Sequence, residues 1–405
     1  MNRVCLTLFD RWVIFTMIVY LLVDAIGGVA RYYLWEIGFV NLIYIPKIMA
    51  SLTLLFALRN LKINKLYFWT IYTLILFATV GIFYVNDFLQ VAFGFWVFVP
   101  LLFGIVAYRS FLHDIQKLER WFLILFFIGC GGVFLNAFIN LPWVGFNYFL
   151  ASVEIEGSKQ GSTMGIAKLG GFSQANHVVA SYTILLAIIL MARKHSKILR
   201  CSIWFLTALV IVLTSSKGIA LVFLVLTGFF LCWRHFPDFI WPALALFITI
   251  FVVIMLPFST LYYDYNVDLS EPACYFFFQS SIERLANTWP ATFKMITEHG
   301  NIITGRGLGG IGGAQKLFEY LLYSPADNLF IYLYAVFGLM ALPILVIYGA
   351  GTLQLNIRKN FLDRYFYTIM LSVLIYGITT NIIESTIFSI FLGLSIAHIF
   401  AKKYH

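Results

Sequence analysis

Long apolar runs separated by short polar connections repeat along most of the chain. The runs are about 20 residues long, which is the length that an α-helix needs to cross the hydrocarbon core of a bilayer. The pattern predicts twelve transmembrane helices, near 10–30, 37–58, 66–85, 88–108, 120–139, 171–192, 200–215, 217–233, 238–258, 327–352, 365–383 and 386–401. We therefore expect an all-α, polytopic transmembrane helical bundle.

The composition indicates the same class of protein. Of the 405 residues, 61% are hydrophobic and 11% are charged, whereas a soluble domain is about half apolar and about a quarter charged. These fractions exclude a soluble enzyme, a disulfide-stapled secreted module and a disordered protein. The cysteines have no paired spacing and no HExxH-like cluster occurs, so the sequence predicts neither disulfides nor a bound metal or other cofactor.

The basic residues predict the orientation in the membrane. With these spans, eighteen Lys and Arg fall on one side, eight fall on the other, and Lys47 lies inside a span. The positive-inside rule then places both termini in the cytoplasm. The net charge of +9 is therefore attributed to orientation rather than to nucleic-acid binding. The first run has no small-residue cleavage signal and is expected to be a transmembrane helix rather than a removable signal peptide.

Two polar segments on the predicted outer side are too long to be simple turns. They span roughly 140–170 and 259–326, and long loops that are not linkers tend to carry function. The second is large enough for a small extramembrane subdomain. The chain is therefore expected to divide into helices in 1–258, a large periplasmic loop in 259–326, and the remaining helices with the cytoplasmic C-terminus in 327–405.

Two features mark the large loop. The stretch SSIERLANTWPATFKMI has the spacing of a short amphipathic helix, with one apolar side formed by Ile282, Leu285, Trp289, Phe293 and Ile296. The stretch GRGLGGIGG at 305–313 lacks the GK[ST] of a nucleotide-binding loop. Its glycines are expected to permit a tight turn or a close backbone approach to a sugar or phosphate.

Three of the eight basic residues on the predicted outer side, where positive charge is disfavoured, are candidate site residues. Lys217 lies in TSSKG between two apolar runs. An ionisable group there indicates function by default, and the alternative is a side chain that reaches from a tight turn to the interface. Arg284 and Arg306 lie in the large loop. Guanidinium groups fit pyrophosphate oxygens, so the set is a candidate anion clamp, although each Arg alone would be a solvated surface residue.

Candidate bases and polar ligands lie at the same predicted depth. Asp327 and Asn328 open an apolar helix, and one of them is expected to be its N-cap. Asp327 is also a candidate general base toward a sugar hydroxyl, with Asn328 a substrate-binding candidate beside it. Glu384, between the last two spans, is the second candidate base. Asn176 and His177, at the mouth of the sixth span, either cap that helix or line a cavity for a polar headgroup.

These residues together resemble the O-antigen ligase and polymerase superfamily of bacterial envelope glycan enzymes. Three elements carry the resemblance: TSSKG, similar to the family's T-x-S-[RK]-G; R-x(4)-W at 284–289, followed by a G-x-G-x-G-like stretch at 305–309; and Asp-Asn-Leu at 327–329. The motifs lie between about 170 and 390, and the resemblance in topology covers most of the chain.

The resemblance implies a metal-independent, inverting glycosyltransferase with a GT-C-like fold in the bacterial inner membrane. Its donor would be a glycan on undecaprenyl pyrophosphate, presented at the periplasmic leaflet. Lys217 and Arg284 would bind the pyrophosphate and neutralise the leaving group, and Arg306 is added on position and charge. The implied partners are the lipid bilayer, lipid-linked oligosaccharides, a chain-length regulator and a flippase. The resemblance implies no binding to nucleic acid.

One position distinguishes the branches of this superfamily. Ligases usually have His-Asn or His-Ser where this chain has Asp327-Asn328. The resemblance therefore favours a Wzy-type polymerase, which joins lipid-linked repeat units into O-antigen or a related surface polysaccharide in lipopolysaccharide biosynthesis. The base stays open between Asp327 and Glu384. The alternatives are an O-antigen ligase, a lipid-linked oligosaccharide flippase and a general transporter. A transporter would have ion sites at the middle of the membrane, and Asp24 and Lys47 fit such sites poorly.

Overall fold

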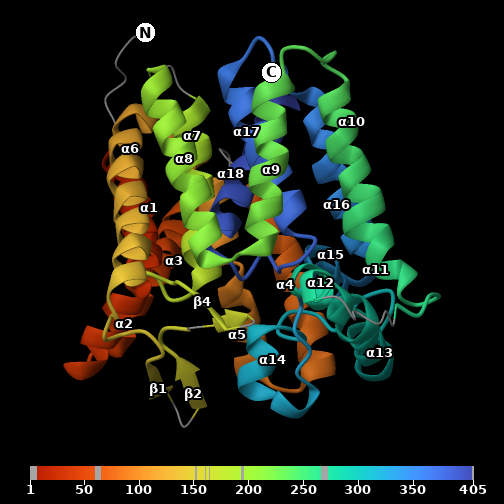
Figure 1. The fold of residues 1–405 in the computed structure, drawn as a ribbon. Helices are drawn as coiled ribbons and strands as arrows, with labels where there is room; N and C mark the ends of the chain where they lie inside the picture. The colour runs from red at the N-terminus through yellow and green to blue at the C-terminus, as the bar shows by residue number, and fades with distance from the viewer. Residues whose placement is uncertain are drawn as a thin grey trace. The chain divides into compact units, whose positions relative to one another are not determined.

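The computed structural model describes residues 7–59, 65–150, 153–159, 161–163, 165–192, 196–265 and 272–403. Within these ranges the chain is nearly all α-helical, with two small β-hairpins (Figure 1). The prediction of an all-α architecture is confirmed to that extent. Residues 1–6 and 404–405, which the predicted topology places in the cytoplasm, and residues 266–271 of the large loop lie outside the described residues.

The chain forms two compact units, each assembled from segments that are distant in the sequence. Unit 1 comprises Met1–Asn64, Pro100–Phe223 and Thr386–Ala397, and unit 2 comprises Lys65–Val99, Leu224–Ser385 and His398–His405. Two helices, α9 (Lys217–Cys232) and α18 (Thr386–Lys403), begin in unit 1 and end in unit 2. The predicted division at 258 and 326 concerns membrane topology and stays a prediction.

Unit 1 contains the N-terminal helices, a long kinked helix and both hairpins. Its elements are α1 (Leu8–Ala25), α2 (Gly27–Glu36), the 3-10 helix η1 (Val40–Tyr44), α3 (Ile45–Leu58), α6 (Val99–Phe138), β1 (Asn147–Leu150), β2 (Val153–Glu156), β3 (Gly161–Thr163), β4 (Ile166–Lys168), α7 (Asn176–Ala192) and α8 (Lys197–Thr214). β1 pairs with β2 and β3 with β4, both antiparallel. The hairpins occupy the polar segment near 140–170.

The first predicted span is broken in unit 1. α1 and α2 meet at a bend of 84°, where Gly27 and Gly28 follow each other and weaken the helix because glycine is a poor helix former. The Ser173 hydroxyl donates to the carbonyl oxygen of Asp24 at 2.7 Å, which satisfies the freed end of α1. The backbone N–H of Gly28 bonds the carbonyl of Phe172 at 2.9 Å, so the polar stretch before α7 holds the bend.

Unit 2 contains the helices of residues 259–326 together with helices from earlier and later parts of the chain. Its elements are α4 (Lys65–Val85), α5 (Phe88–Val97), α10 (Ile240–Phe247), the π-helix η2 (Ile248–Met255), α11 (Leu256–Ser259), α12 (Pro272–Glu283), the π-helix η3 (Arg284–Thr288), α13 (Trp289–His299), α14 (Gly313–Phe318), the 3-10 turns η4 (Tyr320–Leu322), η5 (Gly338–Met340) and η6 (Thr352–Gln354), α15 (Leu329–Phe337), α16 (Ala341–Gly351) and α17 (Phe361–Tyr376).

The predicted amphipathic helix is present as α12, η3 and α13. Trp289, Phe293 and Ile296 are buried, as the sequence pattern requires. Phe293 stacks on Phe258 with ring centroids 5.6 Å apart, and α13 also packs against α15 through Tyr334. Burial of this aromatic stripe fixes the amphipathic helix against the apolar helices of unit 2.

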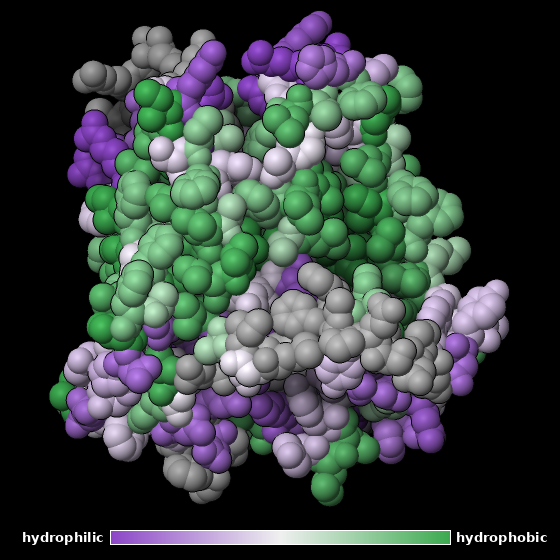
Figure 2. Space-filling model, in the orientation of Figure 1, coloured by the Kyte–Doolittle hydropathy of each residue, from purple (hydrophilic) through white to green (hydrophobic). Residues whose placement is uncertain are grey.

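Fewer described helices have the length and composition of a membrane span than the sequence pattern predicts. Six described helices are long and apolar enough to cross a membrane, and a seventh is obtained if the bent α1–α2 pair is one span. Residues 88–108 and 120–139 join in one helical stretch, Phe88–Phe138, because the segment between them contains no Gly or Pro. It kinks at Asp114, where φ is −117°. Figure 2 shows hydrophobic side chains, in green, along the helix surfaces and hydrophilic ones, in purple, near helix ends.

Candidate functional site

An ion pair in unit 2 joins two of the predicted site residues. The Nε atom of Arg284, at the start of the π-helix η3, lies 3.3 Å from Oδ2 of Asp327. The Arg284 side chain is 21% exposed and that of Asp327 is 43% exposed. Nε makes this contact without a hydrogen bond, whereas Nη1 donates to the carbonyl oxygen of Ser280 at 2.8 Å. The guanidinium group is therefore held in place but not saturated.

Local backbone chemistry explains why Arg284 lies at a π-turn. Pro290 is at the start of α13, and a proline has no N–H to continue the α-helical hydrogen-bond ladder. The chain adopts the wider π-turn over Arg284–Thr288, and such turns inside helices frequently occur at functional sites. The turn joins α12 to α13 without a loop and fixes the position of Arg284.

The helix cap next to Asp327 is supplied by its neighbour. Asn328 accepts hydrogen bonds from the backbone N–H groups of Phe330 and Ile331 at 2.7 and 3.1 Å. Its Nδ2 donates to the carbonyl oxygen of Ile378 at 3.0 Å, and the side chain is fully buried. Asn328 therefore has a structural role as the N-cap of α15. Asp327 does not cap the helix, and its partly exposed side chain pairs with Arg284.

Two further groups lie close to this ion pair. Burial raises the pKa of the Tyr323 phenol, and the negative charges of Glu384 and Asp327 raise it further. The Glu384 carboxylate accepts a hydrogen bond from the backbone N–H of Gly313 at 2.6 Å, at the first turn of α14, where a negative charge is favourable. The two candidate bases are thus both near Tyr323, but Glu384 also serves as a helix cap.

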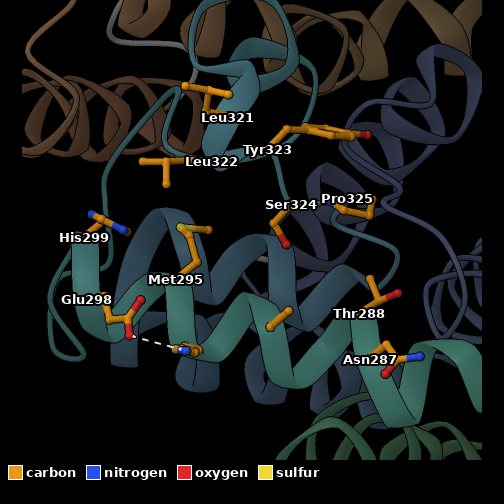
Figure 3. A pocket seen from close by; sticks show the side chains of 12 residues that line it. Asn287, Thr288, Met295, Glu298, His299, Leu321, Leu322, Tyr323, Ser324 and Pro325 are labelled. Atoms are coloured by element: carbon orange, nitrogen blue, oxygen red, sulfur yellow. Dashed lines mark ion pairs between the residues drawn. The ribbon is translucent and has the colours of Figure 1, made fainter.

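A cavity of about 450 Å³ adjoins the ion pair along the chain. One wall is formed by η3 and α13, beginning at Asn287 and Thr288, one turn after Arg284, and the other by residues 321–325, two residues before Asp327. Figure 3 shows the side chains of the two walls facing each other. The lining residues are Asn287, Thr288, Ala291, Lys294, Met295, Glu298, His299, Leu321, Leu322, Tyr323, Ser324 and Pro325.

Buried polar contacts hold the second wall of the cavity. The Ser324 hydroxyl lies 2.6 Å from the Thr292 hydroxyl of α13. Gln315, which is fully buried in α14, donates to the carbonyl oxygen of Leu322 at 2.6 Å and accepts from the backbone N–H of Ser324 at 2.9 Å. This wall is therefore fixed on both sides. The lining of the cavity as a whole combines amide, hydroxyl, charged and apolar side chains, which is typical of a site for a polar organic ligand.

Arg306 lies in a different environment from Arg284. Its side chain is 1% exposed, and Nη2 donates to both carboxylate oxygens of Glu319 at 2.9 and 3.1 Å. Nε donates to the carbonyl oxygen of His299 and Nη1 to that of Gly310. Every nitrogen of the guanidinium group is used inside the protein, so the structure gives Arg306 a packing role and no access to a pyrophosphate.

The glycine-rich stretch also packs inside unit 2 rather than facing a ligand. The backbone N–H of Leu308 donates to the carbonyl oxygen of Phe77 in α4 at 3.0 Å. Gly307 has φ +75°, and a Cβ there would collide with the backbone of Gly81. In α5, Gln90 Nε2 donates to the carbonyl oxygen of Gly309 at 2.9 Å. The expected close backbone approach exists, and its partners are α4 and α5.

The other predicted residues belong to unit 1. The break in TSSKG is a turn: α8 ends at Thr214, Ser215 adopts φ +49°, and Lys217 begins α9 half-exposed. Asn176 Nδ2 donates to the carbonyl oxygen of Thr214 at 2.8 Å, so Asn176 satisfies the C-terminal end of α8. His177 is exposed in the first turn of α7. The substrate-binding roles of Lys217 and His177 stay predictions.

Sequence reasoning missed Tyr323 and the cavity. No motif marks YLLYSPA, and the walls meet only because α13 and residues 321–325 are brought together by Thr292 and Ser324. Within the described ranges, no three His, Cys, Asp or Glu side chains are grouped as a metal site would require. No protein-family model matches the chain, and no curated protein shows significant similarity to it.

Proposed function

We propose that the protein is a glycosyltransferase of the bacterial inner membrane that polymerises undecaprenyl-pyrophosphate-linked repeat units, as the Wzy-type polymerases do. The proposal includes the GT-C-like arrangement, twelve spans and a periplasmic position for residues 259–326. Three of the spans would be the shorter apolar helices at Asn176–Met191, Lys217–Cys232 and Thr386–Lys402. The family resemblance supplies the reaction, and the geometry of unit 2 supplies the residues.

The observation that carries the proposal is the Arg284–Asp327 ion pair beside the cavity. A polymerase needs a cation to stabilise the diphosphate leaving group and a base near the acceptor hydroxyl. Here the cation and the carboxylate are 3.3 Å apart, and the Arg284 Nε has no hydrogen-bond partner among the described residues. The guanidinium group is therefore not saturated by the protein, and a diphosphate can bind its remaining N–H groups.

In the proposed reaction, a sugar hydroxyl of the acceptor unit attacks the anomeric carbon of the donor glycan. The new C–O bond forms as the bond to the diphosphate breaks, with inversion at that carbon. Asp327 takes the hydroxyl proton, and Arg284 binds the departing diphosphate. We favour Asp327 over Glu384 as base because Glu384 is used by the N–H of Gly313. Lys217 enters the proposal through the resemblance alone.

The cavity is the proposed sugar site. Its volume of about 450 Å³ lies within the range of small-molecule sites. Tyr323 offers an aromatic face and Asn287 an amide, and these are the groups that bind the apolar faces and hydroxyls of sugars. A sugar in this cavity would lie beside the ion pair that carries out the transfer.

Contacts inside each unit agree with the proposed sidedness. In unit 1 the Ser110 hydroxyl donates to Asp10 at 2.7 Å, and both residues are assigned to the cytoplasmic side. In unit 2 the contacts between Arg284 and Asp327 and between Gly313 and Glu384 join segments that are assigned to the outer side. These pairings support the proposed topology without using any relation between the units.

The proposal is tested in a strain that lacks the gene, by comparing its lipopolysaccharide on a gel with that of complemented strains. A polymerase predicts that deletion collapses the ladder to core plus one repeat unit and that the wild-type gene restores it. Arg284→Ala and Asp327→Asn should each fail to restore it, by about a hundredfold or more in polymer, at normal protein level. Lys316→Ala, which removes an exposed cation on α14, is the matched control and should restore it.

Other outcomes contradict the proposal. Loss of all sugars from the core, with long lipid-linked glycan accumulating, would indicate a ligase. An unchanged ladder would exclude both enzymes, and full activity of Arg284→Ala would exclude the assigned site.

A further inference from the structure

Two arginines and one tryptophan form a cluster in unit 2. None of the three is among the proposed catalytic or binding residues. The guanidinium carbon of Arg364 is 4.2 Å from the ring centroid of Trp233, and that of Arg234 is 4.9 Å from the same ring. Both distances fall within the range of cation–π contacts. One indole therefore holds two positive charges close together. We call Trp233, Arg234 and Arg364 the Trp233 cluster.

The positive charge of the Trp233 cluster is not neutralised within the part of the chain that the structure describes. The nearby carboxylates are committed elsewhere: Asp238 pairs with Arg358 at 2.8 Å, and Asp363 bonds His398 and Lys402. The Arg364 guanidinium donates only to a backbone carbonyl, that of Ile357, at 3.3 Å.

The two like charges also destabilise each other. Partial burial lowers the pKa of Arg364, and the charge of Arg234 lowers it further. Two guanidinium groups on one ring repel each other, and an anion that binds both removes the repulsion and accepts hydrogen bonds from their free N–H donors. The cluster thus has the chemistry of an anion site.

The cluster is rigidly supported by its neighbours. Arg358 Nη2 donates to the carbonyl oxygens of Phe236 and Arg234 at 2.5 and 3.4 Å, which ties the turn after α9 to the segment before α17. The Tyr367 hydroxyl donates to the carbonyl oxygen of Trp241 at 2.7 Å. The two chain segments that carry the guanidinium groups are therefore fixed before any ligand binds, which lowers the entropic cost of binding.

Exposed apolar side chains on the same segments indicate the source of the anion. Phe239 is 70% exposed, Leu231 71% and Phe361 42%. A free phosphate would gain nothing from these side chains, whereas a phospholipid has acyl chains to cover them next to its phosphate. Basic and aromatic side chains that alternate with exposed apolar ones are typical of the membrane interface.

We propose that the Trp233 cluster binds the phosphate of an anionic phospholipid headgroup, with Arg234 and Arg364 donating to it and the neighbouring phenylalanines contacting the acyl chains. The positive-inside rule assigns this end of unit 2 to the cytoplasmic leaflet. The site is independent of glycosyl transfer, so each proposal can fail without the other.

The test uses the purified full-length protein, delipidated in a neutral detergent. Its thermal unfolding is followed during titration with dioctanoyl phosphatidylglycerol, with dioctanoyl phosphatidylcholine and with glycerol 3-phosphate. We expect phosphatidylglycerol to raise the unfolding temperature at a lower concentration than the other two. Arg234→Gln and Arg364→Gln should each weaken the response to phosphatidylglycerol about tenfold.

Lys359→Gln is the matched control, because it removes one exposed positive charge from the same segment but not from the ring of Trp233. This variant should respond as the wild type does. Since Arg364 is partly buried, Arg234→Gln, which changes an exposed side chain, decides the result if Arg364→Gln does not fold. Equal responses to the two lipids, or a wild-type response in Arg234→Gln, would overturn the proposal. An equal response to glycerol 3-phosphate would show a phosphate site rather than a lipid site and would also overturn it.

Discussion

Two arginine–carboxylate pairs in unit 2 differ in how completely the protein satisfies the arginine, although the sequence assigned both arginines to the same anion clamp. Arg306 and Glu319 form a closed pair: the arginine is 1% exposed and all of its nitrogens donate to the protein. Arg284 and Asp327 form an open pair: both side chains reach the surface and the Arg284 Nε has no hydrogen bond. The cavity is lined by Asn287 and Thr288, which follow Arg284, and by Ser324 and Pro325, which precede Asp327. Its other end includes Met295 and His299, which accept hydrogen bonds from Arg306.

The difference shows how a structural arginine can be separated from a candidate binding residue. A guanidinium group has five N–H donors, and a ligand can use only those that the protein leaves free. Arg306 bonds the glycine-rich stretch and Glu319, so its charge stabilises the folded chain and no donor is free for a ligand. Arg284 is positioned by Ser280 and Asp327 and keeps donors for a ligand. Charge and position in the loop do not distinguish the two residues.

The largest expected effect is on stability, at the closed pair. Arg306→Ala should lower the free energy of unfolding by about 3–5 kcal/mol, because Glu319 and two backbone carbonyls lose a buried partner. Arg284→Ala should cost less than about 1 kcal/mol, since its pair is partly exposed and screened by solvent. Thermal unfolding of both variants in the same detergent measures the difference.

Lys294→Ala serves as the baseline for that comparison, because Lys294 and Glu298 are exposed and 3.8 Å apart. Its unfolding temperature should match that of the wild type. Equal destabilisation by Arg306→Ala and Arg284→Ala would show that the two pairs do not differ as described.

The glycine-rich stretch around the closed pair gives the next largest effect. Gly307→Ala should destabilise the protein by about 3 kcal/mol, because a Cβ would collide with the backbone of Gly81 in addition to the strain of φ +75°. Gly38→Ala is the matched control, since Gly38 has φ +78° with open space around it, and should cost only about 1 kcal/mol. Similar unfolding temperatures for the two variants would mean that the stretch is not tightly packed.

The helices of the fold were accessible from sequence because apolar periodicity reports burial directly. The amphipathic stretch at 280–296 has that periodicity. Trp289, Phe293 and Ile296 on its apolar side are buried, and Ile282 and Leu285 are half-buried. The helical continuity between residues 108 and 120, inside α6, was not predicted, because the polar segment 109–119 indicates a connection in the sequence while its backbone stays helical. The bend between α1 and α2 depends on Ser173, which is distant in the sequence.

The site was accessible only in part. Arg284 and Asp327 were chosen by residue type and resemblance, but their contact depends on the π-turn and on Asn328 taking the cap. Arg306 was grouped with Arg284 because a sequence does not show which donors are satisfied. Tyr323 has no motif, and its place near Asp327 and Glu384 arises from tertiary packing.

A smaller effect separates the two neighbours Asp327 and Asn328. Asn328→Ala should lower the free energy of unfolding by about 2 kcal/mol, because it removes the cap of α15 and the bond to Ile378. Asp327→Asn should change stability by less than about 1 kcal/mol, because the Asp327 side chain is 43% exposed. Thermal unfolding and the lipopolysaccharide gel together should show a stability defect in the first variant and an activity defect in the second. The reverse assignment would make Asp327 the structural residue and would remove it from the site.

The smallest expected effect tests whether the charges of the open pair reach Tyr323. Because burial and the carboxylates raise the pKa of Tyr323 in the folded protein, its stabilising contribution is fully present below the ordinary tyrosine pKa of about 10 and is lost as the pH rises above that value. The wild type should therefore lose stability more steeply than Tyr323→Phe between about pH 9 and 11, and the other tyrosines cancel in the comparison. Introducing Asp327→Asn into both proteins should reduce the difference without removing it, since burial is the larger cause. If the pH profiles of wild type and Tyr323→Phe coincide, Tyr323 is not held near the open pair, and the cavity wall that contains it would have to be placed elsewhere.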